Sequence, residues 1–271
     1  MITKIAILAL FFTTHSSAFG QLGESGVHGL SLGSKPKFGP DLKFSWASEN
    51  AVAGGRITLG AVGTFDSLNP FAVKSIGAAH LADLGGNGLV FENLTMSSLD
   101  EPFATYGTVA EKIDVAKDGL SVTYHLASDA KWSDGKPLTA DDVVFTFKTL
   151  TSSEAPPLYR LYYADVKSGE ALGKSKVKFT FKSFNRELPL IMGQLPLIPQ
   201  HIYGVPGTSF SKNFAKQIPV GSGPYIVKSF EFGKFIEYVR NPNYWGKGKN
   251  FNRGSWNFDS IYIKYYKTKQ L

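Results

Sequence analysis

Alternating apolar and polar residues predict strands at six places along the chain. Successive residues of a strand face opposite sides, so a strand with one buried face shows a period of two. Two of the stretches flank Gly233 and Lys234 and predict a hairpin, because a glycine suits a tight turn. The predicted strands are 56–60, 121–126, 176–182, 225–230, 235–240 and 261–265.

The helical pattern is clearest from Thr139 to Leu150. Thr139 is a suitable N-cap, because its side chain can accept a hydrogen bond from the first turn. Asp141 and Asp142 follow, and acidic residues there interact favourably with the helix dipole. Adjacent side chains on a helix point apart, so this acidic pair predicts a helix start and not an acid–base couple.

Other stretches predict less regular structure. The small and apolar residues of 77–91 predict a helix from about Ala78, interrupted by Gly85 and Gly86. Residues 188–203 contain three prolines and predict short helical pieces joined by loop. Strands combined with few helices indicate a mixed fold of α+β or α/β type.

The composition is that of a folded domain and excludes several classes of protein. The 271 residues are 43% hydrophobic and 19% charged, which excludes a disordered chain. The absence of cysteine excludes disulfide scaffolds, zinc fingers, iron–sulfur clusters, thiol nucleophiles and a lipidated N-terminal cysteine. The 28 glycines and 14 prolines favour a β-rich protein over a helical bundle.

The basic residues that give the net charge of +7 are scattered along the sequence. The densest group contains Lys174, Lys176 and Lys178, which alternate along a predicted strand. This spacing is typical of the solvated face of a strand, so we expect no nucleic-acid partner.

The N-terminus predicts an export signal. Lys4 supplies a positive charge, residues 5–12 are apolar, and small residues precede a cleavage position after Ala18. The apolar run is too short to cross a bilayer, which needs about 20 residues. Residues 1–18 are therefore predicted to be a cleaved signal peptide, and the mature protein is expected in the periplasm.

Motifs for catalysis or metal binding are weak. The five histidines lie at no metal-ligand spacing, so no metal is expected. Gly173-Lys174-Ser175 resembles the end of a phosphate-binding loop, but Ser168 occupies the place of its first glycine. Pro224 directly follows Gly221-Ser222-Gly223, which does not suit the helix behind a serine nucleophile. We therefore expect a binding protein without a cofactor, and not an enzyme.

Four stretches, in order along the chain, resemble one family. The longest contains Trp132, a Ser-Asp-Gly turn and the predicted cap Thr139. Together they resemble the family 5 extracellular solute-binding proteins, the peptide- and nickel-type receptors of ABC importers. Gly29-Leu30-Ser31 and residues 185–196 further resemble the YejA-like oligopeptide branch. The four stretches are residues 65–70 (Phe-Asp-Ser-Leu-Asn-Pro), 129–143, 221–225 (Gly-Ser-Gly-Pro-Tyr) and 241–245 (Asn-Pro-Asn-Tyr-Trp).

The motif residues predict local structure more than contact with a ligand. Trp132 and the glycine of its turn are expected to fix a tight reversal before the helix. Gly221 to Pro224 is expected to form a tight backbone passage at a strand start. Tyr244 and Trp245 are expected to form a packed aromatic corner.

The resemblance implies an architecture and a mode of action. It implies two lobes that are joined by a hinge, close on a ligand and then engage the ABC permease. The first lobe is expected to combine residues 19–70 and 184–271, with residues 71–183 inserted as a subdomain.

The resemblance also implies where an oligopeptide or peptide-like ligand binds. Backbone hydrogen bonds hold such ligands in a strand-like form. The ligand-facing backbone is expected at Gly63, Thr64 and Phe65, with Tyr159 and Tyr162 as further ligand-binding residues.

Members of this family have considerably longer chains, and the resemblance covers only their N-terminal portion. The sequence given stops at Leu271, just after the last predicted strand, so the second lobe is expected to be absent. Three interpretations follow. The first, which we favour, is a periplasmic oligopeptide receptor present as an N-terminal fragment or as the first piece of a split gene. A truncated product with weak or no ligand binding is expected, and a separate second-lobe chain is a candidate partner. The others are a secreted one-lobe interaction protein without ligand capture and a hydrolase of unrecognised type.

Overall fold

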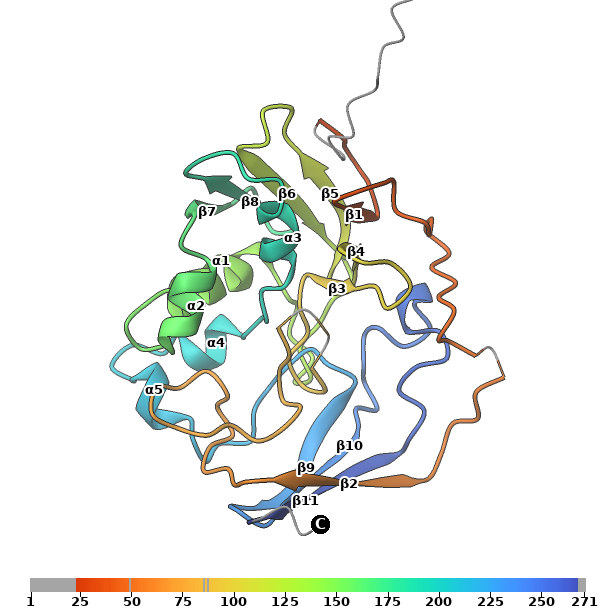
Figure 1. Ribbon diagram of the computed structural model, residues 1–271. Coiled ribbons are helices and arrows are strands. Elements are labelled where there is room, and N and C mark those ends of the chain that lie inside the picture. The colour runs from red at the N-terminus through yellow and green to blue at the C-terminus, as the bar shows by residue number, and fades with distance from the viewer. Residues whose placement is uncertain (1–22, 49, 85, 87, 268–271) are drawn as a thin grey trace, which may run out of the picture.

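The computed structural model describes residues 23–267 except 49, 85 and 87, and within them it has three β-sheets and short helices. Figure 1 shows one four-stranded sheet at the bottom, a second at the upper left, and a small sheet between them. The mixed α/β character that the sequence predicts is confirmed. The predicted signal peptide, residues 1–18, lies outside the described residues and stays a prediction.

The lower sheet has the strand order β2-β11-β10-β9. The first and the last of its strands in the sequence, β2 and β11, are neighbours in the sheet. They pair in parallel, from Arg56 with Ser260 to Val62 with Tyr266. The predicted hairpin is confirmed as the antiparallel pair of β9 and β10. The strands are β2 (Arg56–Val62), β9 (Tyr225–Glu231), β10 (Phe235–Arg240) and β11 (Ser260–Tyr266).

The upper sheet is entirely antiparallel, with the order β5-β6-β8-β7. The small sheet has the order β1-β4-β3 and joins the N-terminal arm to residues 95–107. The strands are β5 (Ala110–Val115), β6 (Ser121–Leu126), β7 (Val166–Ala171) and β8 (Lys176–Phe181), with β1 (Gly29–Ser31), β3 (Thr95–Ser97) and β4 (Ala104–Gly107).

Helix α1 (Ala140–Leu150) begins where the sequence predicts it. Asp142 Oδ2 accepts a hydrogen bond from the Thr139 N–H at 2.8 Å, which caps the helix. Asp142 Oδ1 accepts from the Gln200 N–H at 2.9 Å, so this buried aspartate also ties α1 to α4. The other helices are α2 (Pro157–Tyr162), α3 (Leu188–Gly193), α4 (Gln200–Tyr203), α5 (Phe210–Asn213) and the 3-10 turn η1 (Asn250–Asn252).

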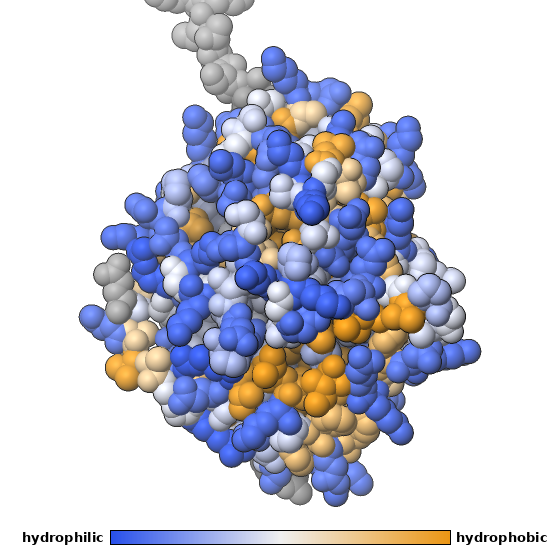
Figure 2. Space-filling view, turned by 180° about the vertical axis from the view of Figure 1, so that it is seen from behind, coloured by the Kyte–Doolittle hydropathy of each residue, from blue (hydrophilic) through white to orange (hydrophobic). Residues whose placement is uncertain are grey.

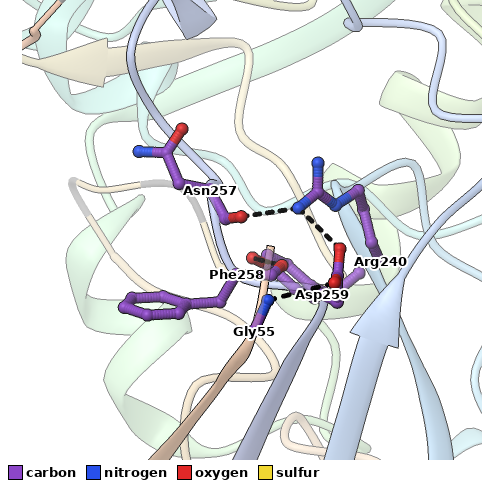
Figure 3. Close-up of polar contacts among 6 residues, drawn as sticks. Gly55, Arg240, Asn257, Phe258 and Asp259 are labelled. Atoms are coloured by element: carbon purple, nitrogen blue, oxygen red, sulfur yellow. Dashed lines mark hydrogen bonds and ion pairs between the residues drawn. The ribbon is translucent and has the colours of Figure 1, made fainter. Parts of the chain in front are cut away.

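Arg240 fixes the starting ends of β2 and β11 (Figure 3). Its Nη2 donates to the Asn257 carbonyl at 2.6 Å and to Asp259 Oδ1 at 3.0 Å. Asp259 Oδ2 in turn accepts from the Gly55 N–H at 3.1 Å. Because Gly55 directly precedes β2 and Asp259 directly precedes β11, this arrangement sets the register in which the two strands start.

The family-like motifs hold local structure in place, mainly through their buried residues. The Trp132 side chain is 1% exposed, and Gly135 of its turn has φ +86°, a conformation that favours glycine. A Cβ on Gly221 would lie 2.0 Å from the Val90 carbonyl oxygen, so this backbone passage has no room for a side chain. The buried residues of these motifs therefore position backbone, whereas the turn after Trp132 and the Pro242-Asn243 pair are exposed.

The helix that the sequence predicts from Ala78 is wrong. The described residues of 77–91 form turns and loop, in which the Leu89 N–H donates to the His80 carbonyl at 2.8 Å. His80 has φ +64°, which a right-handed helix does not accommodate. The stretch is apolar because the loop folds back into the core, with Leu81 and Phe91 fully buried.

Candidate ligand-binding site

The first candidate site lies where β2 and β11 end side by side. Gly63 follows β2 with φ +115°, and its N–H donates to the Tyr266 carbonyl at 2.9 Å. Only glycine adopts this φ without strain, so the chain can turn away from the sheet at this point. We call residues 62–66, 232–234 and 265–266 the strand-end site.

The buried side chain of Phe65 anchors the strand-end site to the core. Its ring is fully buried and packs against Phe232, at 5.4 Å between centroids, and against Tyr265, at 4.8 Å. The Phe65 carbonyl accepts from the Gly233 N–H at 3.1 Å, which joins the segment to the β9–β10 turn. The loop after β2 is therefore held by both neighbouring strand ends.

The segment after Phe65 is closed by its own polar side chains. Asp66 Oδ1 accepts from the Ile76 N–H at 2.7 Å, and the Asp66 N–H donates to the Ile76 carbonyl at 3.0 Å. Asn69 Nδ2 donates to the Phe210 carbonyl at 2.8 Å and connects the segment to α5. These contacts explain the Phe-Asp-Ser-Leu-Asn-Pro motif as a brace for the site.

Thr64 is exposed in this braced segment, as are Val62 and Asp66. Among the described residues, its backbone N–H and C=O have no hydrogen-bond partner. A solvated donor and acceptor on rigid backbone can pair with the backbone of an extended ligand. Exposed apolar side chains lie in the strand-end site at Val62 (64%) and Tyr266 (48%), and beside it at Ile76 (53%), the backbone partner of Asp66.

Tyr159 lies behind this segment. Its ring is 9% exposed and meets the fully buried Phe71 edge-on at 5.8 Å. Burial raises the pKa of Tyr159 to about 12, so its hydroxyl stays protonated. Tyr159 is therefore a core residue packed against Phe71, and its role toward a ligand stays a prediction.

Tyr162 lies in a different place from the other predicted residues. Its hydroxyl donates to Gln194 Oε1, and its side chain lines a cavity between the β3–β4 connection and α3. No described residue of the strand-end site lines that cavity. The structure therefore brings Gly63, Thr64 and Phe65 together, places Tyr159 in the core against Phe71, and places Tyr162 apart.

Two tyrosines, Tyr265 in the strand-end site and Tyr238 on the neighbouring strand β10, have a partner that the sequence patterns did not indicate. Tyr265 Oη accepts from the Ala79 N–H at 2.7 Å, and Tyr238 Oη donates to the Ala79 carbonyl at 2.5 Å. Both tyrosines come from strands whose alternation predicts a buried face, which gives no hint of their distant partner. No group of three metal-ligating side chains occurs among the described residues, and none of their helices has the length and hydropathy of a membrane span.

Comparison with known proteins identifies the family. Residues 104–270 match the family model described as bacterial extracellular solute-binding proteins, family 5 Middle. The chain therefore belongs to the family 5 solute-binding proteins, as its four motifs predict. The structure resembles the oligopeptide-binding protein AppA of Bacillus subtilis, solved with a nonapeptide, with a TM-score of 0.66 and 26% identity over 80% of this chain and 41% of that one.

Two relatives come from Agrobacterium fabrum. The peptidoglycan-binding protein YepA is 38% identical over 245 residues, which are 89% of this chain and 39% of the relative. YejA, whose name describes it as peptide-binding, is 37% identical over 228 residues, which are 82% of this chain and 36% of the relative. The chain thus spans less than half the length of these relatives.

Proposed function

We propose that this chain is the first-lobe part of a periplasmic solute-binding receptor for an ABC importer. Its ligand is an oligopeptide or a peptide-like compound, and the chain itself catalyses no reaction. The observation that carries the proposal is the solvated backbone of Thr64, held rigidly at the joint ends of β2 and β11. Family membership supports the same conclusion.

Backbone contact suits a receptor that accepts many peptides. Hydrogen bonds from Thr64 would read the peptide main chain, which is common to all sequences. The ligand-facing positions are Gly63, Thr64 and Phe65 through their backbone, with Tyr159 as a more distant contributor. Tyr162, expected at the ligand from the family resemblance, lines a separate cavity and is not assigned to this site. The names of YepA and YejA support peptides, including peptides derived from peptidoglycan, as the ligand class.

We propose residues 19–70 and 184–271 as the first lobe, with residues 71–183 inserted. The lower sheet belongs to this proposed lobe, and its edge strand β2 is accessible, which supports packing of further polypeptide against that edge. None of the seven residues of edge strand β2 is buried, and a groove of about 450 Å³ beside it is lined by Ile57, Leu59 and Trp256 among others. Figure 2 shows an apolar patch in the lower half of the face that is turned away in Figure 1.

The second lobe would close over the strand-end site. A ligand on one lobe remains largely solvated, and its ordering cost is poorly offset. The remainder of a family-length polypeptide, or a separate second-lobe chain, would supply the opposite wall. The closed form would then engage the permease, as ligand-driven lobe closure changes the exposed surface.

Isothermal titration tests the proposal. The chain is titrated with a mixture of short peptides and with peptides released from peptidoglycan, alone and together with the C-terminal portion of YepA as second lobe. We expect weak or silent titration by the chain alone and binding by the pair. No heat with the pair, or turnover of the peptide, would contradict the proposal.

Two variants at one position test the role of the backbone. Thr64→Pro removes the N–H donor, whereas Thr64→Ala removes only the side chain. One hydrogen bond contributes about 0.5–1.5 kcal/mol, so Thr64→Pro should weaken peptide binding by about 2- to 12-fold. Thr64→Ala should bind like the unmodified chain, and equal loss in both variants would argue against backbone recognition.

A further inference from the structure

The cavity that contains Tyr162 has the form of a second, separate binding site. It has a volume of about 400 Å³ and lies between the β3–β4 connection, α2 and α3. Ligand pockets for small molecules have volumes of about 300–1,000 Å³. We propose that this cavity binds a small primary ammonium attached to an apolar body.

The apolar part of the lining sets the shape of the ligand body. Leu32, Leu190 and Ile191 are half-buried and line the cavity from the arm and from α3. Phe103 lines it from the β3–β4 connection, and its side chain is 74% exposed. Phe103 has φ +55°, which a bulky residue adopts rarely and only when its surroundings hold it. An exposed aromatic residue thus borders the cavity.

The charged part of the lining determines the sign of the charge that the ligand carries. Glu101 and Glu187 line the cavity, and no lysine or arginine does so among the described residues. Glu101 is fixed in place, because Oε1 accepts from the Lys37 N–H at 2.7 Å and Oε2 accepts from the Tyr106 hydroxyl. A carboxylate held by neutral donors keeps its negative charge available to the cavity.

Glu187, which directly precedes α3, lines the same cavity and acts electrostatically on Tyr162. Burial, and after it the charge of Glu187, raises the pKa of Tyr162, which reports that this carboxylate acts on the phenol. The Tyr162 hydroxyl oxygen and the hydroxyls of Ser97 and Ser98 add further acceptors. An ammonium has three donors and no acceptor, so it matches this set, whereas a carboxylate ligand would meet two like charges.

A matched pair of probes tests the charge requirement. Leucinamide carries a protonated amine near pH 6.5, and N-acetyl-leucinamide has the same side chain without the charge. NMR titration of the full chain should show leucinamide shifting signals of residues 97–105 and 187–194, with at least fivefold weaker binding of the acetylated probe. n-Hexylamine as a third probe separates a plain alkylamine from a peptide amino terminus. Binding of either amine supports the site.

Variants on the cavity and away from it locate the binding. Glu187→Gln keeps the shape of an exposed side chain and should weaken leucinamide binding about fivefold or more. Glu170→Gln, on exposed β7, changes the net charge equally and should leave binding unchanged. Equal binding of the two leucine probes, or an equal effect of the two variants, would overturn the proposal. Because the strand-end site shares none of these residues, the peptide titrations with Thr64 variants are independent of this result.

Discussion

The Glu92 carboxylate and the Tyr244 hydroxyl lie 2.5 Å apart, although 152 residues separate them in the sequence. Trp245 Nε1 donates to the other oxygen of Glu92 at 2.8 Å. Glu92 is fully buried, and its own carbonyl accepts from the Leu197 N–H at 2.9 Å. One acidic side chain therefore joins the Tyr-Trp motif to the centre of the core.

This relationship makes the stability of the chain depend on pH. Burial raises the pKa of Glu92 from 4.5 to about 7, although the hydrogen bonds from Tyr244 and Trp245 lower it in part. A raised carboxyl pKa means that the folded state holds the proton more tightly than the unfolded state. Its contribution is fully present below about pH 4.5 and is lost as the pH rises to about 7.

Glu92→Gln should remove this dependence. The amide resembles the protonated acid, so the variant should gain stability relative to the unmodified chain as the pH rises from 5 to 8, by at most about 3 kcal/mol. Urea unfolding at several pH values measures the difference. Glu111→Gln, at an exposed position, is the control and should track the unmodified chain. Parallel pH curves for Glu92→Gln and the unmodified chain would contradict the prediction.

Asp114 should show the opposite dependence. Burial raises its pKa, but hydrogen bonds from His125, from the Gly26 N–H and from Ser25 outweigh that effect and hold the pKa below 3.8. A lowered carboxyl pKa contributes stability above the ordinary value, and this stability is lost as the pH falls through the folded-state pKa. The contacts join the N-terminal arm to β5 and β6, with His125 Nε2 at 2.5 Å from Asp114 Oδ2.

Asp114→Asn should therefore cost about 1 kcal/mol at pH 7 and less at pH 3. Hydrogen exchange should increase at residues 25–28, where the arm is attached. Asp165→Asn, on an exposed loop, is the matched control and should change neither quantity. An arm that exchanges equally in both variants would show that Asp114 does not hold it.

Gly221 should tolerate no side chain. A Cβ there would lie 2.0 Å from the Val90 carbonyl oxygen, which is backbone and cannot rotate away. Gly221→Ala should lower the free energy of unfolding by about 2 kcal/mol or more. Gly33→Ala is the control, because a Cβ at Gly33 would have no atom within 4 Å, and thermal unfolding should detect little change.

Phe71 should connect the interior to the strand-end site. Its ring is fully buried between Phe91, at 5.3 Å, and Tyr159, at 5.8 Å. Phe71→Ala leaves a cavity and should cost about 3–5 kcal/mol, measured by urea unfolding. Phe71→Leu should cost less and, in the two-lobe titration, should bind peptide more nearly like the unmodified chain. Identical peptide binding by Phe71→Ala and the unmodified chain would separate this ring from the site.

Local signals explain the elements that the sequence predicts correctly. Alternation within β2 and β11, the turn at Gly233 and the cap at Thr139 each depend on residues close together in the chain. The expected position of Thr64 at the site depends on the family resemblance and remains a proposal.

The features that the sequence does not predict depend on distant partners. The sequence around Glu92 contains no signal that Tyr244 and Trp245 will donate hydrogen bonds to its carboxylate. The apolar run after Ala78 has a helical composition, but packing of Leu81 and Phe91 in the core, with Gly77 against Pro70, imposes a loop instead. Tyr162 belongs to the same short helix as Tyr159, but Tyr159 is buried against Phe71 whereas Tyr162 lines a cavity.

The hydrogen bond from Gly63 to Tyr266 has a mechanical consequence. Two segments far apart in the sequence leave the sheet from one shared point, so a displacement of either is transmitted to the other without passing through the core. In a family-length receptor, the polypeptide that continues from Tyr266 would pull directly on the backbone beside Thr64. Ligand binding at the Thr64 backbone and movement of the chain after Tyr266 would then be coupled through this one hydrogen bond.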